Sequence, residues 1–420
     1  MRPVDQSITL PPRAAPRGLP RRSLLQAVSL LVAPRLAHAD SFAEWLSRIR
    51  PKALAKGVSP ETFDRETGGL VPDLSVLDTV NRQAEFTEVL WQYLNRRVSQ
   101  WRIDTGRERA RQHGDLLARV ERVYGVDRFV VLSIWGNESA YGEVMTNPRA
   151  MKPTLPSLGA LAWREARRQA FWESEFINTL VLIEKGWGTQ QTLVGSWAGA
   201  LGQTQFMPSS WLRNGVDFDR DGKIDLNTIA DALGSAAHYL KDRGGWQSGL
   251  PWGYEVKAAD GFNFELADNR RERLVSQWAR LGISRADGKP HPAPEAPARL
   301  TFPAGSNGPG FLLTQNFKAI LAYNSAFSYG MAVGLLADVL AGGAGLVTPW
   351  PGAERQLTTD ELQEIQRRLS ALGFDTGGTD GRVGDMTRKA VQAYQLRMKL
   401  TPADGYPNEA LLKQLRAAQL

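Results

Sequence analysis

Apolar residues recur at helical spacing through most of the first 240 residues of this 420-residue chain. Phe86, Leu90, Trp91 and Leu94 form one such set, and the stretch 116–123 carries another. Only an α-helix brings positions three and four apart onto one face, so this period predicts a mainly helical core. A chain of this length can hold two or three domains.

Residues 245–310 interrupt the helical pattern. Glycine and proline are frequent there, and short strand-like segments occur at 253–256 and 298–302. Helical spacing resumes at 317–321 and continues through 331–340. We therefore interpret 245–310 as a small strand-containing insertion within one helical domain.

Glycine and proline clusters at 342–345 and 349–352 indicate a linker over 342–356. The remaining segment, 357–420, carries two helical patterns. Asp-Gly pairs at 380–381 and 404–405 indicate that this small domain is internally repetitive.

Residues 1–39 have the layout of an export signal. Arg21 and Arg22 precede an apolar run at 24–32, which is too short to span a bilayer, and Ala-His-Ala at 37–39 provides a cleavage pattern. The arginine pair resembles a twin-arginine signal, although a Sec signal also accommodates paired arginines. A disordered basic tail is the alternative. We expect a cleavable signal peptide and a soluble periplasmic protein.

The positive charge of the chain lies mostly in this first stretch. Six arginines and one aspartate give residues 1–39 a charge of +5, out of +7 for the chain. The nearly neutral remainder gives no reason to expect a nucleic-acid partner. The absence of cysteine excludes a lipid anchor on an N-terminal cysteine, disulfides, thiol catalysis and cysteine-ligated zinc.

The segment 134–142, Ile-Trp-Gly-Asn-Glu-Ser-Ala-Tyr-Gly, carries the first candidate for catalysis. Asp127 can cap a helix that leads into it, and Gly142 is placed to end that helix. Glu138 would then lie in the last turn, where the helix dipole and apolar neighbours disfavour a carboxylate and raise its pKa. A protonated carboxyl near neutral pH can protonate a glycosidic oxygen. The alternative is an exposed glutamate at a frayed helix end.

The segment 196–210, Ser-Trp-Ala-Gly-Ala-Leu-Gly-Gln-Thr-Gln-Phe-Met-Pro-Ser-Ser, combines small, hydrogen-bonding and aromatic residues. Sugars present both hydroxyl groups and apolar ring faces, so this mixture suits a glycan-binding groove. A tightly packed loop is the alternative interpretation.

Residues 217–222, Asp-Phe-Asp-Arg-Asp-Gly, match the start of a calcium-binding loop. The twelfth loop position is Thr228 instead of the usual glutamate, and Asp231 could supply the missing carboxylate. A metal-free acidic turn is the alternative. The expected ligands are Asp217, Asp219, Asp221, the carbonyl of Lys223, and Asp231.

These three segments, in their order and spacing, resemble the B-type lytic murein transglycosylases over roughly residues 40–341. The resemblance implies a lysozyme-like helical core with Glu138 as the acid and base, a structural calcium ion and no cofactor for catalysis. It also implies a substrate cleft lined by Tyr93, Ser196, Gln205, Phe206, Tyr239, Tyr323, Asn324 and Tyr329. Residues 357–420 resemble a three-helix peptidoglycan-binding domain, with a departure from that family's pattern at 403–409.

The resemblance implies that peptidoglycan glycan strands are the substrate. Glu138 would break the MurNAc–GlcNAc β-1,4 bond without water, first as an acid and then as a base, and leave 1,6-anhydroMurNAc ends. Glu143, Glu173 and Glu175 lie near in sequence, so a lysozyme-like hydrolase with two carboxylates is the close rival. A wall-binding scaffold is a second rival, but a scaffold would need neither Glu138 nor the segment 196–210.

Overall fold

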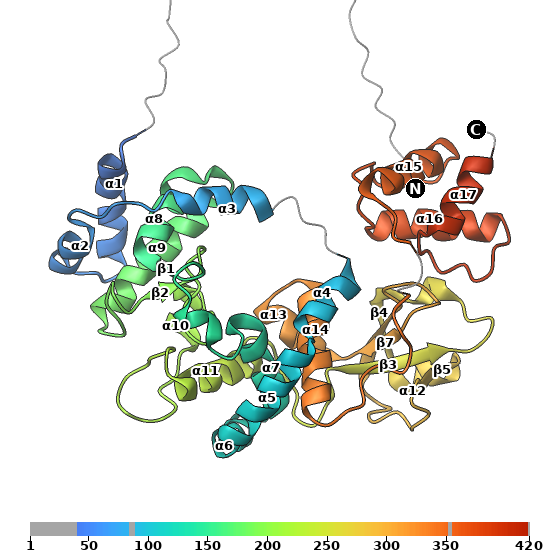
Figure 1. Ribbon diagram of the computed structural model, residues 1–420, viewed down its shortest axis with the longest axis horizontal. Coiled ribbons are helices and arrows are strands. Elements are labelled where there is room, and N and C mark those ends of the chain that lie inside the picture. The colour runs from blue at the N-terminus through green and yellow to red at the C-terminus, as the bar shows by residue number, and fades with distance from the viewer. Residues whose placement is uncertain (1–39, 84–88, 352–354, 419–420) are drawn as a thin grey trace, which may run out of the picture. The chain divides into compact units, whose positions relative to one another are not determined.

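The computed structural model describes residues 40–83, 89–351 and 355–418 (Figure 1). The expected signal peptide at 1–39 and Phe86 lie outside the described residues. The described chain is mostly helical, with one five-stranded sheet and one two-stranded sheet, as the sequence predicts.

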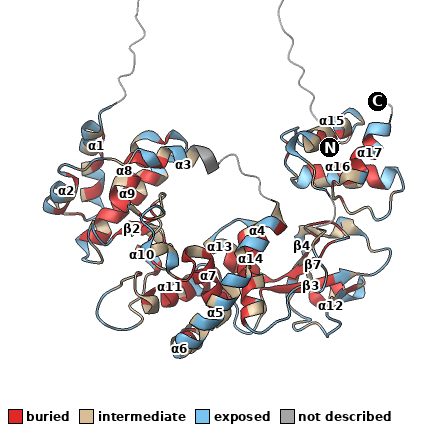
Figure 2. Cartoon of the chain, viewed as in Figure 1, coloured by how far each residue is buried: buried red, intermediate tan, exposed pale blue. Residues whose placement is uncertain are grey.

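One group of helices packs around α9 (Gln169–Glu184), which lies against α1 (Phe42–Ala55), α2 (Pro60–Thr67) and α8 (Thr154–Arg164). Helix α3 (Ser75–Gln83) packs on α8. Trp45 of α1, Leu158 of α8 and Phe176 of α9 are buried in a shared cluster. Because α9 is covered by several helices, apolar residues surround most of it and it has no single polar face (Figure 2).

The central core is built around two antiparallel helices, α7 (Arg128–Ser139) and α14 (Phe327–Leu340). The Ser133 hydroxyl donates a 2.8 Å hydrogen bond to the Val333 carbonyl at their crossing. The surrounding helices are α4 (Leu90–Arg97), α5 (Gln100–Gln112), α6 (Gly114–Tyr124), α11 (Ile229–Asp242) and α13 (Gln315–Tyr323).

No single helix within the described ranges is long and apolar enough to cross a membrane. Helices α13 and α14 taken together are long and apolar enough for a membrane span, but the chain bends by 115° between them. Their apolar residues are buried in the central core.

The insertion predicted at 245–310 holds most of the larger sheet, which continues past the predicted end to Leu313. The strand order of this sheet is β4-β6-β7-β3-β5, and its pairings are antiparallel. Helix α12 (Val275–Arg280) packs beside β4 and β5. The strands are β3 (Gly253–Ala258), β4 (Asp268–Leu274), β5 (Ile283–Arg285), β6 (Pro297–Thr301) and β7 (Gly310–Leu313). Both strands predicted from the sequence are therefore present, as β3 and β6.

The C-terminal segment forms three helices, α15 (Thr359–Ala371), α16 (Asp385–Arg397) and α17 (Glu409–Ala417), around a core of their own. The internal repetition predicted from the two Asp-Gly pairs is confirmed. The Gln366 amide donates to Asp380 at 3.1 Å and accepts from the Gly381 N–H at 2.8 Å. Gln395 bonds to Asp404 and Gly405 in the same way at the same distances. The departure at 403–409 thus keeps the turn.

The first part of the expected linker is packed against the central domain. The N–H groups of Val347 and Thr348 donate to the Glu255 carboxylate at 2.6 and 2.7 Å. The Trp350 ring stacks between Trp91 and Phe311, with centroid distances of 6.3 and 6.2 Å. Residues 346–350 therefore belong to the packed body of the protein.

Candidate active site

Helix α7 positions Glu138, and it begins as the sequence predicts. The Asp127 carboxylate accepts from the N–H of Phe129 at 2.7 Å and of Val130 at 3.3 Å, which caps the helix. The expected end at Gly142 is wrong, because α7 ends at Ser139 and Ala140 already adopts the left-handed conformation. Glu138 is in the last turn, as expected.

Three consecutive residues after α7 have positive φ: Ala140 at 53°, Tyr141 at 58° and Gly142 at 91°. Such angles are costly for residues with a side chain, so the surrounding contacts must hold them. The buried Tyr141 hydroxyl donates to the Arg102 carbonyl at 2.9 Å. Gly142 has a φ of 91°, which favours glycine, and a Cβ there would lie 2.7 Å from the side-chain oxygen of Gln203, which would have to move.

Glu138 lies beside Tyr329 of α14, whose hydroxyl donates a 2.6 Å hydrogen bond to Glu138 Oε1. Burial raises the pKa of Glu138 to about 7, while the Tyr329 hydrogen bond and the positive charge of Arg97 act in the opposite direction. The raised pKa expected from the sequence is confirmed. A carboxyl with this pKa is protonated in a substantial fraction of molecules near neutral pH.

The other glutamates close in sequence are engaged elsewhere. Glu173 forms a 2.6 Å ion pair with Lys52, and Glu175 accepts from the Ser209 N–H at 2.9 Å. Glu143 lies 3.5 Å from Arg109. Within the described part of the chain, no second carboxylate hydrogen-bonds to Glu138 or contributes to its pKa shift. The three glutamates that the hydrolase interpretation would draw on are therefore held by groups other than Glu138.

The segment 196–210 meets the end of α7, a contact that no local pattern in either motif predicts. Gln203 joins them: its carbonyl accepts from the Ser139 hydroxyl at 2.6 Å, and its side-chain oxygen accepts from Trp135 Nε1 at 2.9 Å. Within the segment, Ser196 Oγ accepts from the Ala200 N–H at 3.1 Å. Gln205 has a φ of 52°, and its amide donates to the Gly202 carbonyl at 2.9 Å.

The predicted cleft tyrosines form a continuous group of rings on α11, α13 and α14. Tyr323 stacks on Tyr329 at 6.5 Å and meets Tyr239 edge-on at 5.2 Å. Phe206 contacts both Tyr239 and Tyr323, but it is only 3% exposed. Phe206 therefore supports these rings from behind and offers no open face to a ligand.

Two other predicted residues differ in their surroundings. Tyr93 of α4 is close enough to Glu138 for the glutamate charge to raise the tyrosine pKa, although burial is the larger cause. Asn324 is exposed, and its side-chain oxygen accepts from the Ala326 N–H at 3.0 Å in the turn before α14. Tyr93 thus belongs to the surroundings of Glu138, while the hydrogen bond of Asn324 is local.

Sequence reasoning missed two arginines at the end of α7. Arg97 Nη1 donates to the Asn137 carbonyl at 3.0 Å, and Arg102 Nε donates to the Gly136 carbonyl at 3.2 Å. These carbonyls belong to the last turn, where a helix leaves acceptors without partners. Nothing in the local sequence of α4 or α5 indicates this role, because it depends on how those helices pack on α7.

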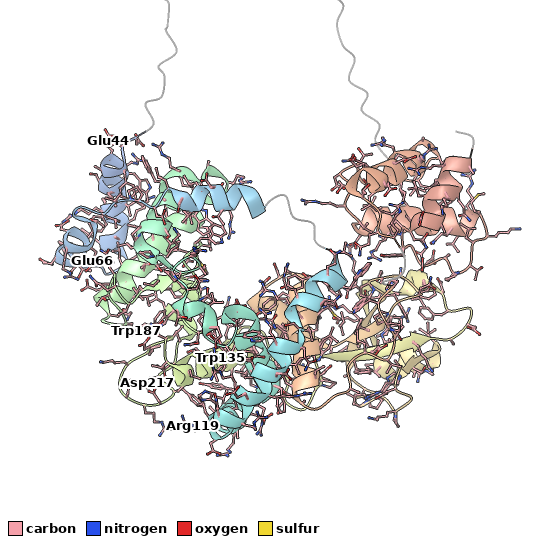
Figure 3. The ribbon with its side chains drawn as sticks, in the orientation of Figure 1. Glu44, Glu66, Arg119, Trp135, Trp187 and Asp217 are labelled. Carbon is pink, nitrogen blue, oxygen red and sulfur yellow. The ribbon has the colours of Figure 1, made fainter. Side chains whose placement is uncertain are left out.

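The acidic loop before α11, where Figure 3 labels Asp217, brings together three of the five expected calcium ligands. Carboxylate oxygens of Asp217, Asp219 and Asp231 lie within 4.8 Å of one another. The pKa of Asp231 is raised, first by burial and also by the charge of Asp219. Asp221 lies outside this group and accepts from the Lys223 N–H at 2.8 Å. Clustered hard oxygens of this kind fit a calcium ion.

A lysozyme-like helical core that holds a partly buried carboxyl with a pKa of about 7 among tyrosines is the arrangement expected of a glycan-cleaving enzyme. The chain belongs to the transglycosylase SLT domain family, whose sequence profile matches residues 41–338. It is a lytic transglycosylase. Residues 358–415 match the peptidoglycan binding domain family.

Several relatives support this assignment. Membrane-bound lytic murein transglycosylase B of Escherichia coli (strain K12) is 29% identical over 288 residues, which are 64% of this chain and 74% of that protein. The structure of SltB3 of Pseudomonas aeruginosa was solved in complex with NAG-anhNAM-pentapeptide, and its sequence is 41% identical to this chain. The two structures superpose with a TM-score of 0.81, and the match covers 90% of this chain and 100% of the SltB3 chain. Escherichia coli Slt35, solved in complex with calcium, is 25% identical to this chain and superposes with a TM-score of 0.59. That match covers 72% of this chain and 93% of the Slt35 chain.

Proposed function

We propose that Glu138 cleaves the MurNAc–GlcNAc bond of peptidoglycan, acting first as an acid and then as a base, and that the product carries a 1,6-anhydroMurNAc end. One observation carries this proposal. Glu138 is a partly buried carboxyl with a pKa of about 7 and is held by Tyr329, while the glutamates near it in sequence, Glu143, Glu173 and Glu175, are engaged by other groups. A retaining or inverting hydrolase needs a second carboxylate across the bond.

The reaction begins when Glu138 donates its proton to the oxygen that links MurNAc to GlcNAc. The N-acetyl group of MurNAc stabilises the positive sugar carbon from within the substrate. Glu138, now a carboxylate, takes the proton of the C6 hydroxyl, and that oxygen closes the 1,6-anhydro ring. Tyr329 donates to Oε1 and so stabilises the carboxylate between the two proton transfers.

The glycan is proposed to lie along the tyrosine group and the segment 196–210. Tyr93, Tyr239, Tyr323 and Tyr329 provide rings and hydroxyls around Glu138, and Ser196, Gln205 and Asn324 provide polar groups, with Phe206 as support. This assignment is supported by the two SltB3 complexes, which contain NAG-anhNAM-pentapeptide and NAG-NAM-pentapeptide. The domain at 358–415 would hold the enzyme on the cell wall.

A structural calcium ion is proposed for the acidic loop, with Asp217, Asp219 and Asp231 as its carboxylate ligands. Asp221 and the carbonyl of Lys223 would complete the set after a small change in the loop. The ion would neutralise the clustered carboxylates and fix the start of α11, which carries Tyr239. It takes no part in bond cleavage. The Slt35 structure with calcium supports the proposal.

We propose that the mature enzyme acts in the periplasm. The basic, apolar and small-residue regions of 1–39 support export, and peptidoglycan is found outside the cytoplasmic membrane.

Mass spectrometry of the products released from purified sacculi tests the reaction. A transglycosylase releases fragments that end in 1,6-anhydroMurNAc and are lighter by one water than the products of lysozyme. Reducing MurNAc ends would show that water is the acceptor, and the hydrolase interpretation would replace this one.

A further inference from the structure

Gln203 lies between the last turn of α7 and the end of the acidic loop. On the α7 side, its side-chain oxygen accepts from Trp135 Nε1 at 2.9 Å, and its main-chain carbonyl accepts from the Ser139 hydroxyl at 2.6 Å. Trp135 and Ser139 are buried, and they stand before and after Glu138 in the chain. Gln203 therefore holds the turn that carries the proposed acid from both sides.

The same glutamine also binds the end of the acidic loop. Its N–H donates to the Leu226 carbonyl at 2.8 Å, and its side-chain Nε2 donates to the Asn227 carbonyl at 3.2 Å. Gly202 permits this close approach, because it has a φ of 74° and a Cβ on it would lie 2.5 Å from the Leu226 carbonyl oxygen. Trp135 Nε1 can only donate and a carbonyl can only accept, so these two partners fix the orientation of the Gln203 amide.

Hydrogen bonds continue from Asn227 to the clustered carboxylates. The Asn227 N–H donates to Asp225 Oδ1 at 2.9 Å, and the Asp225 N–H donates to Asp231 Oδ2 at 2.8 Å. Asp231 is one of the three aspartates whose carboxylate oxygens lie within 4.8 Å of one another. Like charges at this spacing repel, so the arrangement of the loop depends on whether a cation lies among them. A continuous series of hydrogen bonds therefore joins these carboxylates to α7, where Figure 3 labels Trp135.

The reaction is sensitive to the position of the turn at the end of α7. Glu138 must give a proton to one oxygen and take a proton from another, and a displacement of about 1 Å can cost ~10²-fold in rate. Residues 140–142, which follow the helix, all have positive φ, so contacts from other segments must hold them. The hydrogen bonds of Gln203 to Trp135 and Ser139 are contacts of this kind.

We propose that Gln203 is a positioning residue of the cleavage reaction, and that it couples the acidic loop to the turn that carries Glu138. Calcium bound in the loop then alters the catalytic turn as well as the stability of the fold. The inference rests on the proposed roles of Glu138 and of calcium. Gln203 acts through Trp135 and Asn227, because its planar amide binds α7 through its oxygen and the loop through its nitrogen.

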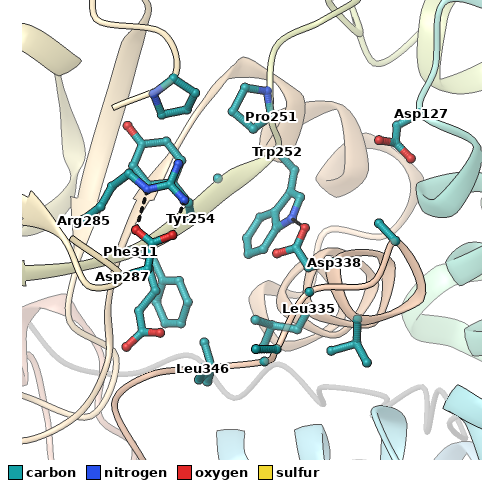
Figure 4. A pocket seen from close by; sticks show the side chains of 18 of the residues that line it. Asp127, Pro251, Trp252, Tyr254, Arg285, Asp287, Phe311, Leu335, Asp338 and Leu346 are labelled. Atoms are coloured by element: carbon teal, nitrogen blue, oxygen red, sulfur yellow. Dashed lines mark hydrogen bonds and ion pairs between the residues drawn. The ribbon is translucent and has the colours of Figure 1, made fainter. Parts of the chain in front are cut away.

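Nuclear magnetic resonance of the full-length chain, labelled with ¹⁵N at the tryptophan indoles, tests the coupling without measuring activity. The Trp135 indole signal, assigned with Trp135→Phe, should shift when calcium is added to wild type. Two variants should abolish this response: Gln203→Met has neither hydrogen-bonding group, and Gln203→Glu keeps an acceptor for Trp135 but loses the donor to Asn227. Trp252 is the control, because its Nε1 donates to Asp338 of α14 at 3.0 Å, away from the loop and from Gln203 (Figure 4). Its signal should not respond to calcium in any of these chains.

Kinetics on soluble glycan fragments show whether the coupling matters for cleavage. Gln203→Met should lower kcat by about tenfold and change KM by no more than about twofold, because the acid is misplaced while the glycan still binds. Chelation should lower kcat in wild type and leave it unchanged in Gln203→Met. Gln247→Met changes an exposed glutamine and is the matched control, which should behave as wild type does. Melting curves with and without calcium show that each variant folds and still binds the ion.

Each failure is recognised by a different result. The coupling is wrong if calcium raises the wild-type melting temperature but leaves the Trp135 signal in place, or if Gln203→Met keeps the wild-type kcat. Loss of the melting response to calcium in Gln203→Met would assign Gln203 to ion binding and also overturn the proposal. A wild-type melting temperature that ignores calcium would remove the ion and the coupling together. Cleavage by Glu138→Gln would overturn the proposed acid instead, and the Trp135 signal does not depend on that result.

Discussion

The Tyr329 hydroxyl donates a 2.6 Å hydrogen bond to Oε1 of Glu138, joining two residues that are 191 positions apart in the chain. This bond holds the Glu138 carboxyl, the proposed acid, in one orientation and favours its ionised form. Burial favours the neutral form and is the larger effect, so the pKa of Glu138 rises to about 7. The balance between these two effects sets the pH range in which the acid can work.

Tyr329→Phe should move the pH profile of cleavage. The free enzyme needs protonated Glu138, so kcat/KM should fall as the pH rises through about 7. Removing the Tyr329 hydroxyl removes a donor that favours the carboxylate, so the pKa of Glu138 should rise by on the order of one unit. The falling limb should therefore move to higher pH. Tyr323→Phe, whose hydroxyl donates to the Thr204 carbonyl, is the matched control and should shift the limb less.

Glu138→Gln should abolish most of the activity. Glutamine keeps the shape and can still accept from Tyr329, but it can neither donate nor take the protons of the two steps. General acid–base catalysis contributes ~10²–10⁴-fold, and here one residue performs both transfers, so a loss near the upper limit is expected. Release of soluble fragments from sacculi measures the loss. Cleavage at a substantial fraction of the wild-type rate would rule out Glu138 as the acid.

The same variant should be more stable than wild type at neutral and higher pH. The pKa of Glu138 is about 7 in the folded chain and 4.5 for an ordinary glutamate, so the folded state binds the proton more tightly. Wild-type stability should therefore fall as the pH rises from 4.5 to 7, by at most about 3 kcal/mol. Glu138→Gln lacks this term. Urea unfolding at several pH values should show a difference that grows over this range, and a constant difference would contradict the raised pKa.

Calcium should stabilise the folded chain. A metal that binds only the native state adds about 2.7 kcal/mol when its concentration is a hundred times Kd, so chelation should lower the melting temperature. Asp217→Ala should melt at the same temperature with and without calcium, because it removes one of the three clustered carboxylates. Asp260→Ala changes an exposed acid outside the cluster and should keep the response. Identical wild-type curves in calcium and in chelator would disprove the site.

Removing the C-terminal domain should separate wall binding from catalysis, and the position of the cut matters. Deletion of residues 355–420 should leave a folded, active enzyme that sediments less with sacculi. Deletion of 346–420 should also lower the melting temperature, because it removes Trp350 from Trp91 and Phe311 and takes two donors from Glu255. Equal sedimentation of the shorter deletion and the full chain would disprove the targeting role.

Much of the fold follows from local patterns in the sequence. The cap at Asp127, the helices at 116–123 and 331–340, and the strands at 253–256 and 298–302 are all present. Each depends on residues within a few positions of one another, so short-range spacing is enough to predict it. The end of α7 is an exception, because the sequence predicts it at Gly142 whereas the helix ends at Ser139 and Ala140 and Tyr141 already have positive φ. The hydrogen bond from the Tyr141 hydroxyl to the Arg102 carbonyl, which holds Tyr141 in place, comes from a remote helix.

The sequence by itself determined the helical class and the order of the segments, and it singled out Glu138 as the candidate acid. Only the tertiary structure decided what surrounds that residue: Tyr329 as its partner, Arg97 as the nearby cation, and Glu173 and Glu175 occupied by other groups. It also placed Asp231, but not Asp221, beside Asp217. The physical reason is distance along the chain. Helix period and capping act within one or two turns, whereas burial and long-range hydrogen bonds exist only after remote segments have packed together.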